Sequence, residues 1–175
     1  RHRLDGVHLD YIRYRDSTVC CCDGCRDRFS HDAKIRLQRW PKALEQKATR
    51  DAYNRWRCGR ITHLVREMRA MLQREAPGTE LSAAVFGRYP LCKDSVAQDW
   101  FLWLQRGYVD AVCPMNYTTD LSAFRRWTAD QTALPGTRGR ILPGIGVTAK
   151  DTHLDPVQVI EQIQEIRRLD HPGFV

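Results

Sequence analysis

The sequence predicts an α/β fold in which parallel strands alternate with helices. Short apolar segments typical of buried strands recur along the 175 residues, and longer segments with helical spacing of apolar residues separate them. Such alternation favours parallel strands joined by right-handed crossovers. We expect strands over residues 5–10, 81–86, 109–114, 141–146 and from 173 onward.

The first predicted strand leads directly into a group of polar and aromatic residues. Side chains alternate along a strand, so Val7 and Leu9 share one face. Gly6, His8 and Asp10 share the other face. If helices cover the apolar face, Asp10 lies at the inner, carboxyl end of the strand, where parallel α/β barrels carry out chemistry. The alternative for a single Asp in this position is a turn cap.

A long loop over residues 16–50 follows and contains a cluster of cysteines, namely Cys20, Cys21, Cys22 and Cys25. The two-residue gap between Cys22 and Cys25 is typical of a zinc knuckle, and Cys20 could supply a third thiolate. No second Cys-x-x-Cys pair follows in the chain. We therefore predict no metal, favour a disulfide or a packed loop, and keep zinc at Cys20, Cys22 and Cys25 as the alternative.

Three of the helices expected after this loop carry clear sequence signals. Residues 54–75 carry one apolar stripe on an arginine-rich helix, which Ala76-Pro77-Gly78 ends. Residues 99–107 form a shorter helix, with Asp99 in the position of an N-cap. The last helix opens at Asp155-Pro156, a cap followed by a proline in the first turn.

Several segments, in their order and spacing, resemble one bacterial family. They are Asp5-Gly6-Val7-His8-Leu9-Asp10-Tyr11-Ile12-Arg13-Tyr14, Trp56-Arg57, Leu81-Ser82-Ala83-Ala84-Val85-Phe86-Gly87, Gln98-Asp99-Trp100, Gly107-Tyr108-Val109-Asp110, Cys113-Pro114-Met115-Asn116-Tyr117 and Pro143-Gly144-Ile145-Gly146. The chain is similar in these segments to the "family 10 glycosyl hydrolase-like" proteins of the bacterial envelope, whose catalytic domain is a TIM barrel.

The resemblance implies a partial TIM (β/α)8 barrel made of roughly the last five strands with their helices. A complete barrel has about 250 residues, so we interpret residues 1–175 as a single incomplete glycoside-hydrolase-like barrel domain, truncated at both ends. The resemblance also implies an extracytoplasmic protein, whether periplasmic, lipoprotein-anchored or secreted, with its signal region outside this chain.

Glycoside hydrolysis normally requires two carboxyl groups. We assign Asp10 as the nucleophile or base. The strand at 81–86 ends without a carboxylate, so the general acid is sought in the loops after the strands, at Asp99 or Asp120. The residues expected to bind substrate are His8, Tyr11, Arg13, Tyr14, Trp100, Met115, Asn116 and Tyr117.

The predicted function is therefore a glycoside hydrolase that acts on a bacterial cell-envelope polysaccharide, with peptidoglycan glycan strands lacking stem peptides as the implied substrate. No cofactor is expected, and no apolar run reaches the ~20 residues that span a membrane. The alternatives are a non-catalytic barrel that binds glycan and a basic nucleic-acid-binding module with a zinc knuckle. The net charge of +7 suits the latter, but we expect no nucleic acid, because aromatic residues are not interleaved with the basic ones around the cysteines.

Overall fold

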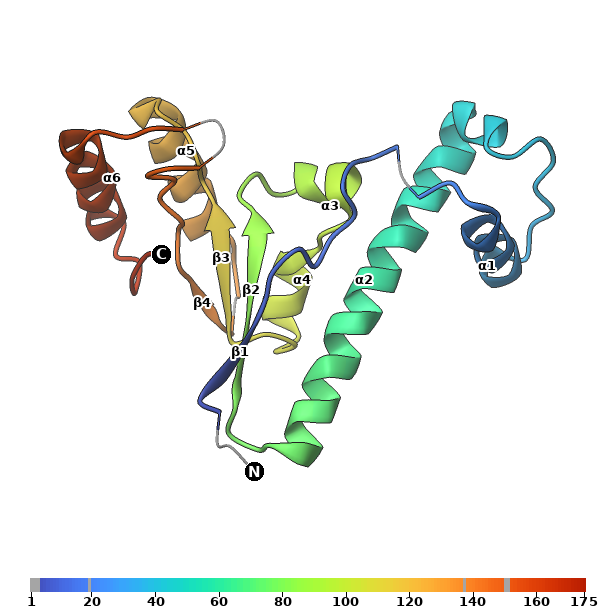
Figure 1. Ribbon diagram of the computed structural model, residues 1–175, viewed down its shortest axis with the longest axis horizontal. Helices are drawn as coiled ribbons and strands as arrows, with labels where there is room; N and C mark the ends of the chain where they lie inside the picture. The colour runs from blue at the N-terminus through green and yellow to red at the C-terminus, as the bar shows by residue number, and fades with distance from the viewer. Residues whose placement is uncertain (1–3, 19, 137, 150–151) are drawn as a thin grey trace.

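The structure is a computed structural model, and it describes residues 4–18, 20–136, 138–149 and 152–175. Within this part of the chain the fold is α/β, as predicted. The strands are β1 (Gly6–Leu9), β2 (Glu80–Phe86), β3 (Ala111–Met115) and β4 (Arg140–Ile141). They form one parallel sheet in the order β1-β2-β3-β4, and helices connect them (Figure 1).

The strand expected over 141–146 is regular for only two residues, Arg140–Ile141. Leu142 N–H donates to Val112 O, and Gly144 N–H donates to the Pro114 carbonyl. Proline has no N–H of its own to return to the neighbouring strand, so the ladder breaks opposite Pro114. Pairing resumes at a single bridge between Met115 and Gly144.

The last residues of the chain continue the sheet beyond β4. Val175 N–H donates to Pro143 O at 3.1 Å, and Ile145 N–H donates to Val175 O at 2.7 Å. These two bonds are the pattern of a parallel pair, which fits the strand expected from residue 173. The sheet is consistent with part of a barrel, and the described residues do not close it.

Two groups of helices lie beside the sheet. The long α2 (Lys47–Glu75) and the short α3 (Leu91–Val96) and α4 (Trp100–Gln105) lie on the side of β1 and β2 in Figure 1. The pair α5 (Leu121–Thr132) and α6 (Pro156–Arg168) lies on the other side, near β3 and β4.

The main core fills the space between the sheet and the first group of helices. Alternate residues of β2, namely Leu81, Ala83 and Val85, are fully buried. They belong to one cluster with Trp103 and with Val65 of α2. The opposite face of the same strands carries smaller or polar side chains and is only half-buried. The alternation predicted from the sequence therefore divides the sheet into a core face and an open face.

The segment expected as a long loop contains helical structure. It forms α1 (Asp23–Ala33) and a 3-10 turn over Lys42–Glu45, and α2 begins at Lys47, ahead of the expected residue 54. Cys25, Phe29 and Tyr53 are buried together in a second, smaller core cluster. Figure 1 shows α1 beside the end of α2 that lies far from the sheet. The sequence did not predict α1 because this helix buries only two residues, which is too few to give a helical pattern of apolar residues.

A membrane span is not found among the described residues: none of their helices combines the length and the apolar character needed to cross a bilayer.

Candidate functional site

A cavity of about 280 Å³ lies at the carboxyl ends of the strands, on the open face of the sheet. Its described lining residues are His8, Asp10, Tyr11, Arg13, Ala84, Cys113, Met115, Tyr117, Gly144 and Val175. They come from the ends of β1, β2 and β3 and from the segment after β4. Parallel strands end at one edge of their sheet, which is why residues so distant in sequence meet here.

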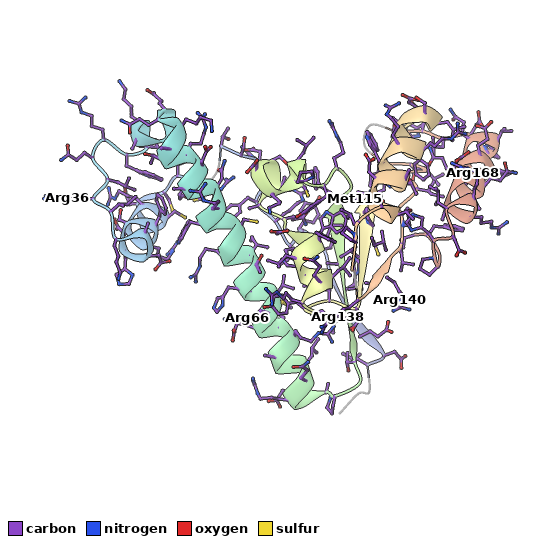
Figure 2. All side chains as sticks on the ribbon, turned by 180° about the vertical axis from the view of Figure 1, so that it is seen from behind. Arg36, Arg66, Met115, Arg138, Arg140 and Arg168 are labelled. Atoms are coloured by element: carbon purple, nitrogen blue, oxygen red, sulfur yellow. The ribbon has the colours of Figure 1, made fainter. Side chains whose placement is uncertain are left out.

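The sheet register fixes the floor of this cavity. His8 of β1 pairs with Ser82 of β2, and His8 Nδ1 lies 2.8 Å from Ser82 Oγ. Ala84 pairs with Cys113 of β3. Met115, labelled in Figure 2, ends this strand. Ser82, Ala84 and Cys113 are small, so the floor leaves space above the sheet for a ligand.

Asp10 stands at the rim, directly after β1. Its Oδ1 accepts a hydrogen bond of 2.7 Å from the backbone N–H of Tyr11, and its side chain is otherwise open to the cavity. Tyr11 has a positive φ of 53°, a left-handed conformation that non-glycine residues rarely adopt. This conformation turns the chain sharply and holds the Asp10 carboxylate at the strand end, as the sequence predicted.

Arg13 packs against two aromatic rings near the same turn. Its guanidinium lies 4.7 Å from the ring centroid of Tyr11 and 4.9 Å from that of Phe86 at the end of β2. Tyr11 itself is 74% exposed, so its ring forms a flat apolar surface at the cavity mouth. The turn thus combines a carboxylate, a cation and an aromatic ring within five residues of sequence.

Tyr117 forms the opposite wall, and two glycines make room for its ring. A Cβ on Gly146 would lie 2.8 Å from Tyr117 Cβ and Cγ, and a Cβ on Gly144 would lie 3.3 Å from Tyr117 Cε1. This close approach explains the Pro-Gly-Ile-Gly segment. Burial and the nearby negative charge of Asp10 raise the pKa of the Tyr117 hydroxyl, which keeps it protonated as a hydrogen-bond donor.

Asn116 lies outside the cavity, unlike the expectation that it binds substrate. It is fully buried behind the strand end, where its Nδ2 donates to Gln131 Oε1 and Gln131 Nε2 donates back to Asn116 Oδ1. Gln131 Nε2 also donates to the carbonyl of Gly87. A Cβ on Gly87 would lie 2.0 Å from Asn116 Oδ1. Asn116 therefore ties the ends of β2 and β3 to α5 and supports the cavity from behind.

Two further residues expected to bind substrate also lie elsewhere. Trp100 is fully buried in the core, and its Nε1 donates to Phe86 O. The half-buried ring of Tyr14 faces the Arg57 guanidinium at 4.9 Å, toward α2. His8, Tyr11, Arg13, Met115 and Tyr117 are the expected binding residues that the structure brings together around Asp10.

The two general-acid candidates both serve as helix caps. Asp99 begins α4 and accepts from Leu102 N–H, from the Tyr89 hydroxyl at 3.0 Å and from Lys93 Nζ at 3.0 Å. Asp120 begins α5 and accepts from the Ser122 hydroxyl and from the N–H groups of Ala123 and Ser122, and these hydrogen bonds lower its pKa. Neither lines the cavity, and Asp10 is the only acidic side chain among its described lining residues.

Some residues of the site were not predicted from the sequence. Cys113 of β3 lines the cavity, and burial raises its pKa. Ala84 could have been found from its alternation with the buried Ala83 and Val85. Gln98 is fully buried and links Ile12 O, Ala84 O and Phe86 N–H, so it fastens the end of β1 to β2. No local pattern distinguishes it from a surface glutamine.

A separate group of metal-ligand side chains lies beside α1. Cys20, Cys22 and Cys25 bring their sulfur atoms within 4.8 Å of one another, and all three are free thiols. A hydrogen bond from the Cys20 side chain, with the N–H groups of Cys25 and Gly24, lowers the pKa of Cys22 to about 7. The sequence favoured a disulfide or a packed loop here, and the structure forms no disulfide among these cysteines.

The cavity can hold a neutral or cationic polar ring system. Tyr11 and Tyr117 offer flat surfaces, Arg13 and the Tyr117 hydroxyl offer donors, and Asp10 offers a carboxylate. Such a combination is typical of a site that binds a hydroxyl-rich ligand and acts on it by acid, base or nucleophilic chemistry.

Comparison with known proteins agrees with this chemistry. No curated protein matches the chain. A family model described as Glycosyl hydrolase-like 10 matches residues 1–139, which is well over half of the chain and contains Asp10, Arg13 and Tyr117. The chain therefore belongs to the glycosyl hydrolase-like 10 family, and this membership implies a carbohydrate substrate.

Proposed function

We propose that this chain carries part of the active site of a glycoside hydrolase that cleaves a bacterial cell-envelope polysaccharide outside the cytoplasm. The proposed substrate is the glycan strand of peptidoglycan after its stem peptides have been removed. The observation that carries this proposal is the Asp10 carboxylate, which stands at a strand end in a cavity walled by Tyr11 and Tyr117.

Asp10 suits the role of nucleophile or base because its carboxylate is exposed. Only one of its oxygens has a backbone donor, Tyr11 N–H at 2.7 Å, so the other remains available to a sugar carbon or to a water molecule. Arg13 on the same turn places a positive charge against the Tyr11 ring at the cavity mouth. The protonated Tyr117 hydroxyl can donate to a sugar hydroxyl across the cavity.

The flat rings support recognition of a sugar. Tyr11 is the more exposed of the two tyrosines, and Arg13 against its ring limits the positions that the ring can take. A pyranose ring has an apolar face of similar width, and its burial against an aromatic ring is favourable. Peptide-free glycan fits this site better than a cross-linked strand, since the cavity holds only about 280 Å³.

A second function, glycan binding without cleavage, is favoured by one observation. Asp10 has no carboxylate partner among the described residues that line the cavity, and hydrolysis normally uses two. The caps at Asp99 and Asp120 would have to leave their helices to serve as the acid.

The test compares the complete natural protein with its Asp10→Asn variant for release of new reducing ends from peptide-free glycan strands. We expect wild-type activity to fall by about 10²–10⁴-fold in the variant. Asp51→Asn is the matched control, because Asp51 forms only an exposed ion pair with Lys47 on α2. If both proteins bind the glycan and neither releases reducing ends, the proposed hydrolase is wrong and the chain is a glycan-binding protein.

Asn substitutions also test the two acid candidates without breaking their helices. Asparagine caps a helix about as well as aspartate but cannot donate the proton of a carboxylic acid. A loss of activity in Asp99→Asn or Asp120→Asn, with unchanged helix content by circular dichroism, would identify the acid. Full activity in both would place the acid elsewhere in the protein.

A further inference from the structure

We propose that Cys20, Cys22 and Cys25 bind a Zn²⁺ ion that fastens the start of α1 to the segment before it. The proposal concerns residues that do not line the Asp10 cavity, and it does not depend on the proposed function. The three sulfur atoms lie within 4.8 Å of one another, and no other such group of three is found in the described part of the chain.

The spacing of the sulfurs suits a tetrahedral ion. Zn–S bonds of about 2.3 Å at tetrahedral angles place neighbouring sulfurs about 3.8 Å apart. Sulfurs that already lie within 4.8 Å reach that separation by small side-chain rotations. Cys22 is exposed, so the ion has a path to the site from solvent.

The backbone around the site matches the needs of bound thiolates. Cys22 is the N-cap of α1, and its sulfur lies beside the N–H groups of Gly24 and Cys25 in the first turn. Amides that donate to metal-bound sulfur spread its negative charge and fix its orientation. Here the first turn of α1 supplies those amides without any change of fold.

A basic side chain balances the charge of the proposed complex. Three thiolates and one Zn²⁺ carry a net charge of −1. The Arg28 guanidinium, one turn along α1, donates to Cys25 Sγ at 3.5 Å. A guanidinium in this position offsets the negative charge and stabilises the thiolates that the metal requires.

The aromatic cluster beneath the site holds its backbone in place before any metal binds. The Tyr53 hydroxyl donates to Cys20 O, and Trp40 Nε1 donates to Cys21 O at 2.9 Å. Both aromatic rings belong to the second core cluster, together with Cys25. A preordered site loses less conformational entropy when it binds an ion.

Zinc accounts for the group of three better than a disulfide does. A disulfide joins two sulfurs at about 2.05 Å and leaves the third cysteine as a free thiol. A zinc ion binds all three sulfurs. The neighbouring Cys21 is excluded as a ligand, since its thiol donates to Thr18 O at 3.2 Å. A water molecule then completes the tetrahedron on the exposed side.

The experiment measures zinc bound to the complete protein, produced with zinc in the medium and passed through a desalting column. We expect about one zinc per chain by mass spectrometry of the metal, and almost none in Cys22→Ser. Cys21→Ser is the matched control and should keep the full zinc content. Substitution of Co²⁺ should give a thiolate charge-transfer band in the near ultraviolet, and Cys22→Ser should lack this band.

Three results would overturn the proposal. The first is a metal-free wild type with three thiols that all react with a thiol reagent. The second is a wild type whose mass is lower by two hydrogens, which would show a disulfide. The third is a loss of zinc in Cys21→Ser equal to that in Cys22→Ser, which would rule out the three-residue assignment. Folding of each variant is checked by circular dichroism, so that loss of metal is not confused with loss of structure.

Discussion

Tyr11 combines a strained backbone with an exposed ring, which is a common arrangement at functional sites. Its φ of 53° lies in the left-handed region, where a non-glycine residue costs roughly 1–2 kcal/mol. The contact between the Tyr11 ring and the Arg13 guanidinium, at 4.7 Å, offsets about 0.5–1 kcal/mol of this strain. The remaining strain is the part that glycine would relieve.

Tyr11→Gly should therefore raise the free energy of unfolding slightly, by less than about 1 kcal/mol, because relief of strain is partly offset by loss of the Arg13 contact. If the proposed function is correct, glycan affinity should fall about three- to tenfold, since a ring contact is lost. Urea unfolding and glycan-binding titration measure the two effects.

Lys34→Gly is the control for this pair of effects. Lys34 has the same φ of 53° at the C-cap of α1, and it lies outside the cavity. The free energy of unfolding of the Lys34→Gly variant should rise by about 1 kcal/mol, with no change in glycan affinity. Equal loss of affinity in both variants would show that the Tyr11 ring does not touch the glycan.

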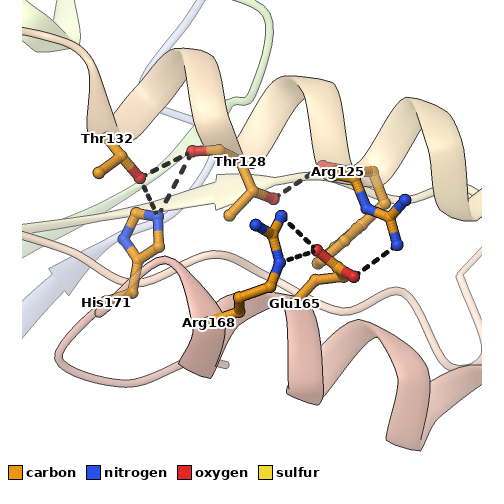
Figure 3. A network of polar contacts seen from close by, with 7 residues as sticks. Arg125, Thr128, Thr132, Glu165, Arg168 and His171 are labelled. Atoms are coloured by element: carbon orange, nitrogen blue, oxygen red, sulfur yellow. Dashed lines mark hydrogen bonds and ion pairs between the residues drawn. The ribbon is translucent and has the colours of Figure 1, made fainter.

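At the scale of elements, one buried carboxylate joins α5 to α6. Glu165 of α6 accepts from Arg125 of α5 at 2.5 Å and from Arg168 at 2.7 Å (Figure 3). In the same region, His171 lies against the last turns of α5, with Nε2 2.8 Å from Thr132 Oγ1. The hydrogen bond from Arg125 is the main cause of a lowered pKa at Glu165, and it outweighs the opposite effect of burial.

This lowered pKa predicts a stability that depends on pH. A carboxyl group with a lower pKa in the folded than in the unfolded state contributes stability above its unfolded pKa of about 4.5 and loses it as the pH falls through the folded pKa. Glu165→Gln should cost about 1 kcal/mol near pH 7, a modest amount because both guanidinium groups are about half exposed. The difference from wild type should shrink below about pH 4.

Urea unfolding at several pH values checks this expectation. The matched control is Glu161→Gln on the same helix, since Glu161 forms no ion pair within the described ranges. It should show no comparable change with pH. A wild type and a Glu165→Gln variant that lose stability in parallel on acidification would contradict the assignment.

At the scale of the whole molecule, α2 connects two separate cores. Near its C-terminal end it contributes Val65 and Leu72 to the core beneath the sheet. Near its N-terminal end it contributes Tyr53 to the cluster that contains Phe29 and Cys25. Figure 1 shows how far α1 and its surroundings lie from the strands along this one helix.

We expect the smaller core to open by itself. Phe29 is 1% exposed and meets the Tyr53 ring with centroids 5.0 Å apart, so Phe29→Ala should cost about 3–5 kcal/mol locally. Hydrogen exchange read by mass spectrometry should quicken in α1 and leave β2 and β3 protected. Phe124→Ala, at a fully buried position of α5, is the control and should leave exchange in α1 unchanged. Faster exchange in β2 after Phe29→Ala would show that the two cores unfold together.

The local features of this protein could be predicted from the sequence. Period-two alternation over residues 5–10 set the core face of β1, Asp155 and Pro156 set the start of α6, and Asp10 was found at the end of its strand. These features follow from the geometry of one strand or one helix turn, so nearby residues suffice to predict them.

The tertiary structure alone decided which of the expected site residues meet. The chain direction at the end of β3 sends Tyr117 into the cavity and its neighbour Asn116 behind it, to Gln131 on α5. It likewise buries Trp100 in the core and gathers three cysteine sulfurs at the start of α1. Neighbouring residues that both resemble binding residues in the sequence point to opposite sides of a strand end. Which of these sides becomes a cavity depends on packing between segments far apart in the sequence.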